Sequence, residues 1–113
     1  MPGLNDLRNK TSIPELYSCP DFQIDGVLFP GNRLHIHVQW PGKPKLTPRL
    51  YRLGQEALGI VKRAAAEHGI PAIYVLVPVS LVKWETMFGF EPIEEWTNRL
   101  GSENLILMKQ ATS

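Results

Sequence analysis

The sequence predicts an α/β (α+β) domain with a mixed, mostly antiparallel central sheet of about five to six strands flanked by two helices. A chain of 113 residues, of which 43% are hydrophobic and 20% charged, has the size and composition of one globular core. Hydrophobic residues alternate with polar ones at positions 34–38, which is typical of a strand with one buried face. Between positions 50 and 64 they recur every three or four residues, which is typical of an amphipathic helix that packs on such a sheet.

Residues 1–22 are predicted to form an extended N-terminal arm, and residues 23–113 a single domain. Pro2, Pro14 and Pro20 remove backbone donors from the first segment, and its large apolar side chains are few. We expect this arm to dock on its own subunit or on a neighbouring one.

A hairpin and a long helix are expected next. Residues 23–29 and 33–40 suit the two strands of the hairpin, with a Pro-Gly-Asn turn between them. Thr47 has the side chain of an N-cap, Pro48 suits the first helical position, and Gly69 can adopt the left-handed conformation that ends a helix. The repeating apolar face of this helix comprises Leu50, Leu53, Ala57, Ile60, Val61 and Ala64.

The rest of the chain reads as a strand, a short helix and two strands. Residues 72–77 are apolar and β-prone, which predicts a strand buried on both faces and therefore helices that pack on the sheet. Ser80 is the expected cap of the second helix, Gly89 its left-handed stop, and Phe90 is expected to fold back on its last turn. Residues 93–97 and 105–109 are predicted to be the last two strands, joined by a turn around Gly101.

Charge is distributed unevenly along the chain. Residues 1–63 contain nine Lys or Arg against five Asp or Glu, whereas residues 64–113 contain three against six. The basic residues in the middle could meet a phosphate-bearing ligand, nucleic acid or an acidic protein, or form an ordinary solvated face; the charge alone leaves these alternatives open. They are Lys43, Lys45, Arg49, Arg52, Lys62 and Arg63.

Several classes of site are excluded or disfavoured. The lone Cys19 excludes an internal disulfide and sites built on several thiolates. His35 and His37 share one face of a strand, but no third metal ligand accompanies them, so no metal site is predicted. His68 suits the dipole at the end of a helix. Nucleic-acid binding is not expected, because aromatic and basic side chains interleave only around Tyr51.

No membrane span or signal peptide is expected. The longest mostly apolar run, residues 72–82, is shorter than the ~20 residues that cross a bilayer, and no charged-then-apolar leader opens the sequence. These observations predict a cytoplasmic protein.

The order and lengths of the elements over residues 26–109 resemble the GNAT (GCN5-related N-acetyltransferase) fold without its opening helices. In that family a loop of pattern Arg/Gln-x-x-Gly-x-Gly/Ala enters the long helix and holds the pyrophosphate of coenzyme A. Here the pattern falls on residues 49–54: Arg49 and Gly54 match, and Arg52 replaces the central glycine. The family's second hallmark, a helix with a tyrosine general acid that closes in Gly-Phe, falls on residues 83–90, with Glu85 at the tyrosine position.

These departures weaken the chemistry that the resemblance implies. Arg52 places a long side chain where a phosphate would approach the main chain, so it either blocks or clamps that group. Thr47 and Pro48 reduce the free amides at the helix start. An ordinary glutamate, with a pKa near ~4.3 against ~10 for tyrosine, is a poor acid at neutral pH. Pro78 replaces an asparagine that often orders the family's site.

We therefore expect a degenerate, non-catalytic GNAT-like protein with a structural or protein-interaction role and no cofactor. The pattern of a helix ending in glycine, an acidic strand and a short last strand resembles small GNAT-like proteins of tailed bacteriophages, which implies a location in the bacterial host or the virion. A protein partner or self-association is expected.

Two alternatives remain open. The first is an active acetyl-CoA-dependent N-acetyltransferase, with Arg49, Arg52 and Gly54 on the cofactor and Glu85 or Glu94 transferring protons. One of four acidic residues could act as a general base, or all four could form an ordinary solvated face. They are Glu85, Glu91, Glu94 and Glu95. The second is a regulatory binder that pairs an exposed edge strand with a partner.

Overall fold

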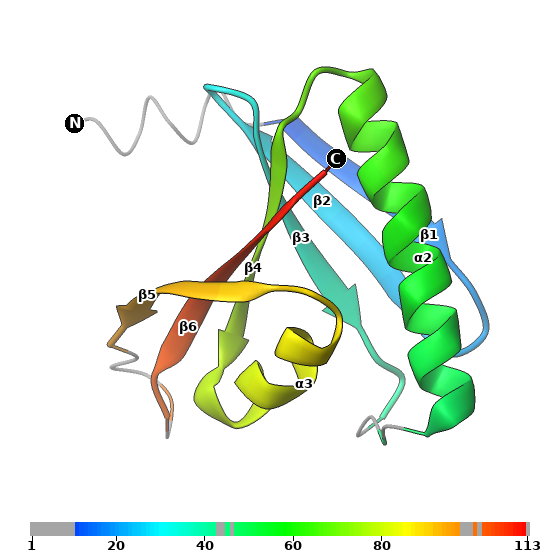
Figure 1. Ribbon diagram of the computed structural model, residues 1–113, viewed down its shortest axis with the longest axis vertical. Coiled ribbons are helices and arrows are strands. Elements are labelled where there is room, and N and C mark those ends of the chain that lie inside the picture. The colour runs from blue at the N-terminus through cyan, green and yellow to red at the C-terminus, as the bar shows by residue number, and fades with distance from the viewer. Residues whose placement is uncertain (1–10, 43–44, 46, 98–100, 102, 113) are drawn as a thin grey trace.

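The protein is built on one six-stranded sheet with two α-helices (Figure 1). The computed structural model describes residues 11–42, 45, 47–97, 101 and 103–112. In sequence order the elements are β1 (Thr11–Ser18), β2 (Gln23–Phe29), β3 (Arg33–Gln39), α2 (Pro48–Glu67), β4 (Ala72–Pro78), the 3-10 turn η1 (Val79–Leu81), α3 (Val82–Met87), β5 (Glu91–Trp96) and β6 (Leu105–Ala111).

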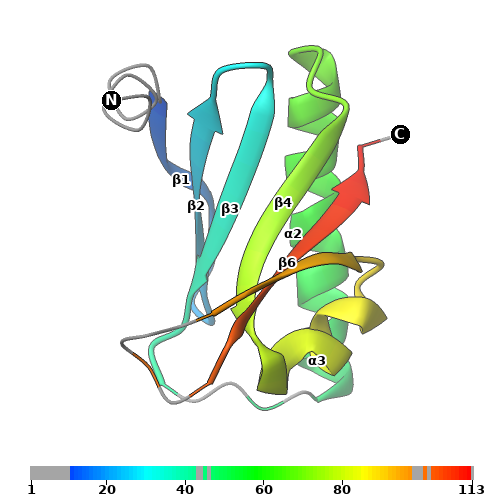
Figure 2. The ribbon, with the colours of Figure 1, turned by 90° about the vertical axis from the view of Figure 1, so that its left-hand side faces the viewer.

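The sheet is mixed and mostly antiparallel, as predicted. Its strand order is β1-β2-β3-β4-β6-β5. Only β3 and β4 run parallel among the described strands, and α2 makes the crossover between them. Seen from the side, α2 lies along one face of the sheet and α3 lies at one end of it (Figure 2). The fold class and the expected order of elements from β2 onward are confirmed.

Helix α2 begins and ends where the sequence predicts. The Thr47 hydroxyl accepts a hydrogen bond from the amide of Leu50 at 3.1 Å, and Pro48 is the first helical residue. At the other end Gly69 has a φ of +74°, the left-handed conformation that stops the helix at low cost. The buried residues on its sheet-facing stripe are Leu50, Ala57, Leu58, Val61 and Ala65.

The core lies between α2 and the middle of the sheet. Ile73 of β4, Met108 of β6 and Val61 of α2 are its most deeply buried large side chains. The prediction that β4 is buried on both faces holds only in part, because Tyr74 and Leu76 are half-buried. Tyr74 is covered by side chains: the His35 ring stacks on it at 5.2 Å, and the Arg33 guanidinium lies 4.2 Å from its centre.

The second half of the predicted arm is a strand of the sheet. Residues 11–18 are extended, as expected, but they pair antiparallel with β2 as its outer neighbour. The sequence alone does not predict this strand, because Pro14 argues against a regular element. The ladder tolerates it through a break in register between Ile13 and Tyr17, where Glu15 has a φ of +54°.

The second helix differs from the prediction at its start. Ser80 does not cap it: this residue lies in η1, and its amide and hydroxyl donate to the Glu103 carboxylate at 3.1 and 3.0 Å. Helix α3 begins at Val82 with no side-chain cap. Its end is as predicted, since Gly89 has a φ of +98° and the amide of the buried Phe90 donates back to the Glu85 carbonyl.

Strand β5 begins two residues before and ends one residue before its predicted bounds, and β6 ends two residues later than predicted. The turn around Gly101 falls partly outside the described residues. None of the helices in the described segments is long and apolar enough to cross a membrane.

Candidate functional site

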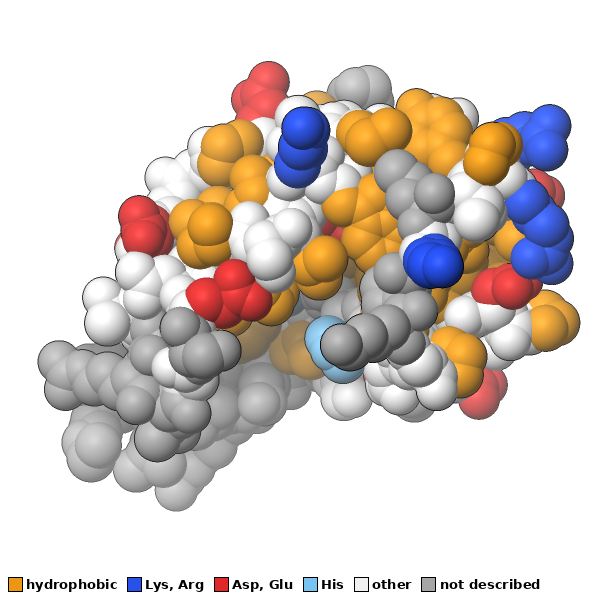
Figure 3. Space-filling view, turned by 90° about the horizontal axis from the view of Figure 1, so that it is seen from below, with side chains coloured by type: hydrophobic (Ala, Val, Ile, Leu, Met, Phe, Trp, Pro, Cys, Tyr) orange, Lys and Arg blue, Asp and Glu red, His pale blue; other side chains and the backbone are white. Residues whose placement is uncertain are grey.

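The two parallel strands separate at the end of the sheet that carries α3 and the start of α2. Strands β3 and β4 pair at three positions, Leu34–Ile73, His35–Tyr74 and Ile36–Val75. Beyond these positions each strand continues without pairing to the other, and the two diverge in Figure 1. Hydrophobic side chains cover much of this end of the molecule, and basic side chains lie mainly on the right of the view in Figure 3.

The start of α2 has few backbone donors to offer an anion. Pro48 has no N–H, the amide of Leu50 is bound by the Thr47 hydroxyl, and the amide of Tyr51 makes the first helical hydrogen bond, to the Thr47 carbonyl at 2.9 Å. Of the four amides that a helix start normally leaves free, here those of residues 47–50, the ones at positions 48 and 50 therefore have no N–H to offer a phosphate. The donor deficit expected from Thr47 and Pro48 is what the structure shows.

The two arginines expected near a pyrophosphate lie on the exposed side of α2. Arg49 makes two hydrogen bonds of 3.1 Å to the Asp21 carboxylate, beside the start of β2. These contacts raise the pKa of Arg49, first by hydrogen bonding and then by the charge of Asp21. Arg52 is exposed. The structure thus couples Arg49 to an acidic neighbour and leaves Arg52 in solvent.

Gly54 has a packing role in this structure. A methyl group in place of its hydrogen would lie 2.6 Å from Cε1 of Phe88, closer than atoms of this kind approach. The Phe88 ring is held in turn by Tyr51, with ring centres 5.2 Å apart. Tyr51 donates a hydrogen bond to the Met87 carbonyl at 3.2 Å, which ties α2 to α3. The close contact with Phe88 therefore explains why position 54 is a glycine, without any role in binding phosphate.

Stacked aromatic rings connect the separated strands. Trp40, which follows β3, stacks on Trp84 of α3 with ring centres 5.0 Å apart and an interplanar angle of 29°. The ring centres of Phe22 and Trp40 are 5.2 Å apart, and those of Phe88 and Trp84 are 6.1 Å apart. The indole nitrogen of Trp84 is buried and has no hydrogen-bond partner in the described structure.

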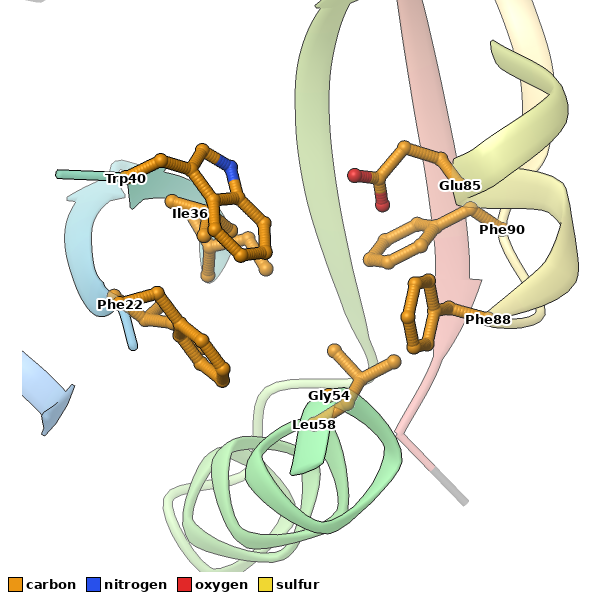
Figure 4. A pocket seen from close by; sticks show the side chains of 10 residues that line it. Phe22, Ile36, Trp40, Gly54, Leu58, Glu85, Phe88 and Phe90 are labelled. Atoms are coloured by element: carbon orange, nitrogen blue, oxygen red, sulfur yellow. The ribbon is translucent and has the colours of Figure 1, made fainter. Parts of the chain in front are cut away.

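A small pocket remains beside this cluster (Figure 4). Its volume is about 40 Å³. Trp40 and Phe22 form one wall, Phe88 and Phe90 form the opposite wall, and Leu58 of α2 lies below them. Aliphatic side chains of β2 and β3 complete the lining. The space holds a group of a few heavy atoms.

Glu85 is the charged residue of this pocket. It projects from α3, and its carboxylate points toward Trp40 (Figure 4). No described residue donates a hydrogen bond to the carboxylate or pairs with its charge. Burial among apolar groups raises its pKa from the ordinary 4.5 to about 7. The expectation that this glutamate is a poor acid at neutral pH assumed an ordinary pKa, and it does not hold here.

The structure brings Gly54 and Glu85 into one pocket and separates them from the other predicted residues. Glu94 lies on β5, a strand whose residues are all exposed. His37 is exposed, and His35 is half-buried between the Phe29 and Tyr74 rings, where burial lowers its pKa. No group of three metal-binding side chains occurs among the described residues.

Sequence reasoning missed the aromatic lining. Phe22 precedes β2 and Trp40 follows β3. Trp40 stacks on Trp84, which lies 44 positions further along the chain. Trp40 at the end of an alternating strand was the available signal, since a large aromatic residue there must pack against whatever follows the crossover.

Solved structures of acetyltransferases share this fold. The aminoglycoside 6'-N-acetyltransferase from Enterococcus faecium has a TM-score of 0.67 at 11% identity, over 93% of this chain and 76% of its own. An aminoglycoside 6'-N-acetyltransferase complexed with coenzyme A also has a TM-score of 0.67, at 10% identity, over 97% and 77% of the two chains. The ribosomal-protein-S18-alanine N-acetyltransferase from Escherichia coli has a TM-score of 0.52 at 14% identity, over 85% and 72%.

The predicted fold of GNAT-family acetyltransferases is therefore confirmed. At these identities the likeness concerns the fold alone. No protein-family model and no curated protein sequence matches this chain.

Proposed function

We propose that this protein is a non-catalytic protein of GNAT fold that acts as a structural or protein-interaction component. The observation that carries this proposal is the aromatic filling between the separated strands. Trp40, Trp84 and Phe88 pack there, and the pocket of about 40 Å³ beside them is too small for the long arm of acetyl-CoA. The residues present do not fit that cofactor.

The start of α2 supports the same proposal. A pyrophosphate needs backbone donors and free cations. Thr47 and Pro48 remove donors from the helix start, and Arg49 already pairs with Asp21.

A surface suited to partners lies on β5. This strand is at the edge of the sheet, so one side of its backbone is not paired within the described sheet. All six of its residues are exposed, including Ile93 at 50% and Trp96 at 43%. An exposed edge with large apolar side chains favours strand addition by a protein partner or a second copy. Native mass spectrometry tests self-association; a monomer at all concentrations would leave only a different protein as the partner.

The setting we propose for this role is the virion of a tailed bacteriophage or its host cell. Its support is the sequence pattern alone: a helix that ends in Gly89, an acidic strand and a short last strand.

Calorimetric titration with acetyl-CoA tests the main proposal. We expect no saturable binding at concentrations up to several times ~100 μM. A dissociation constant below ~100 μM, which corresponds to about 5.5 kcal/mol, would contradict it, because a filled groove could not supply that free energy.

A second candidate is an active N-acetyltransferase, and Glu85 is the observation that favours it. A carboxyl group with a pKa of about 7 is suited to proton transfer at neutral pH, and it stands where the family's tyrosine would be. In this case Arg49, Arg52 and Gly54 would contact the cofactor. An assay of thiol release with a panel of amines separates the two candidates. Turnover that Glu85→Gln abolishes and Glu91→Gln leaves intact would establish the enzyme; no turnover supports the non-catalytic role.

A further inference from the structure

The pocket beside Trp40 contains one charged group and no partner for it. Glu85 is the only charged residue among the described residues that line the pocket, and its carboxylate projects into the pocket from α3 (Figure 4). A carboxylate in apolar surroundings is unfavourable unless a cation or hydrogen-bond donor compensates it. No described residue of the protein supplies either, so above its pKa the carboxylate is left to water or to a ligand that enters the pocket.

The walls of the pocket favour a cation with an apolar exterior. The side chains of Phe22, Trp40, Phe88 and Phe90 form the two opposite walls. The faces of aromatic rings carry negative charge and attract cations, and their surfaces pack well against methyl groups. An anion would be repelled by Glu85, and an extended polar molecule would lose its hydrogen bonds with water.

We propose that this pocket binds a small tertiary methylammonium ion, of which protonated trimethylamine is the simplest example. Its single N–H donates to the Glu85 carboxylate, and its three methyl groups lie against the aromatic walls. The proposal does not depend on the proposed structural role, and the acetyl-CoA titration above tests that role separately.

The number of donors and acceptors selects this degree of methylation. A primary ammonium has three N–H donors that point in different directions, and Glu85 supplies the only side-chain acceptor of the described lining, so the donors that point away from it would face apolar walls and lose their water. A quaternary ammonium has no donor and leaves the carboxylate without a hydrogen bond. A tertiary ammonium directs its single donor at the carboxylate and presents only methyl groups to the apolar walls.

The size of the pocket agrees with this ligand. A volume of about 40 Å³ exceeds what one water needs by a factor of about three. Trimethylammonium has four heavy atoms and therefore fills the pocket without requiring the walls to separate.

Nuclear magnetic resonance titrations at pH 8 test the proposal with four probes, read at the indole N–H of Trp40. The probes are trimethylammonium, tetramethylammonium, methylammonium and tert-butanol, the last a neutral molecule of similar shape. We expect trimethylammonium to bind with millimolar affinity, methylammonium and tetramethylammonium more weakly, and tert-butanol at least about tenfold more weakly than trimethylammonium. Equal affinity for trimethylammonium and tert-butanol, or no saturable shift up to about 100 mM, would overturn the proposal.

A matched pair of variants sharpens the test. Glu85→Gln keeps the shape of the side chain and removes its charge, so it should weaken trimethylammonium binding at least about tenfold. Glu91→Gln removes a similar charge from the exposed strand β5 and should leave binding unchanged. If Glu85→Gln bound trimethylammonium as well as the unaltered protein, the carboxylate would not be the recognition group and the proposal would be wrong.

Discussion

Strands β3 and β4 are hydrogen-bonded over one part of their length, the paired half, and diverge over the other, the separated half. The two halves differ in the side chains that pack there. Where the strands are hydrogen-bonded, Leu34, Ile36, Ile73 and Val75 are aliphatic and at most 5% exposed. Where the strands diverge, Trp40 and Trp84 stack between them and a pocket remains. A carboxylate and the Trp84 indole nitrogen there lack partners among the described residues. The paired half is what a stable core requires. The separated half retains groups that cost stability, which is the usual mark of a region kept for another purpose.

Shortening a buried side chain in the paired half should have the largest effect on the free energy of unfolding. Ile73 is fully buried, so Ile73→Ala should lower the free energy of unfolding by about 3 to 4 kcal/mol through lost burial and the cavity left behind. Urea denaturation measures this loss. Ile93→Ala is the control, because half of the Ile93 surface is exposed and its loss should cost less than about 1 kcal/mol. Similar values for the two variants would contradict the division between core and edge.

Removing the charge of Glu85 in the separated half should increase the free energy of unfolding at high pH. The pKa of Glu85 is about 7 in the folded protein and near 4.5 when unfolded, so the folded state binds the proton more tightly. The free energy of unfolding is therefore highest below pH 4.5, falls as the pH rises from 4.5 to 7, and stays reduced above pH 7. At 1.36 kcal/mol per pKa unit the loss reaches about 3 kcal/mol at most.

Glu85→Gln should remove this dependence. The variant should match the unaltered protein near pH 4 and exceed it at pH 8 by up to about 3 kcal/mol, as measured by urea denaturation across the pH range. Glu91→Gln serves as the comparison, because this residue is exposed at the edge of the sheet. A Glu85→Gln variant with the same pH profile as the unaltered protein would show that the carboxyl is well solvated.

Two glycines of α2 should respond in opposite directions to the same substitution. Gly54→Ala gains about 1 kcal/mol of helix propensity but forces the Phe88 ring to move, which costs about 1 to 3 kcal/mol, so we expect a net loss near 1 kcal/mol. Gly59 has no neighbour within 4 Å of the added methyl group, so Gly59→Ala should stabilise the protein by about 0.5 to 1 kcal/mol. Thermal denaturation measures both, and a stabilising Gly54→Ala would remove the packing explanation for that glycine.

The sequence predicts the end of a helix wherever one residue determines the local backbone conformation or caps the helix. Thr47 and Pro48 start α2, and Gly69 and Gly89 stop the two helices, because capping and left-handed conformations depend on the residue itself and its nearest neighbours. Ser80 failed as a cap for a tertiary reason: its hydroxyl is bound by Glu103, twenty-three residues later.

Only two residues of the candidate site were predictable from the sequence. Gly54 and Glu85 were named from their positions in a family pattern, but that they share one pocket with Phe22 and Trp40 depends on how far β3 and β4 diverge. Strand β1 was likewise hidden, since Pro14 obscured a pairing that the neighbouring edge of β2 makes possible.

By itself the sequence determined the class of fold, the order of elements from residue 23 onward, and the shortage of backbone donors at the start of α2, because periodicity and capping are local properties. Only the tertiary structure decided that Gly54 accommodates Phe88, that Trp40 stacks on Trp84, and that Glu85 has a pKa of about 7. Contacts and burial join residues far apart in the chain, and the charge that a carboxyl carries depends on the groups that surround it in space.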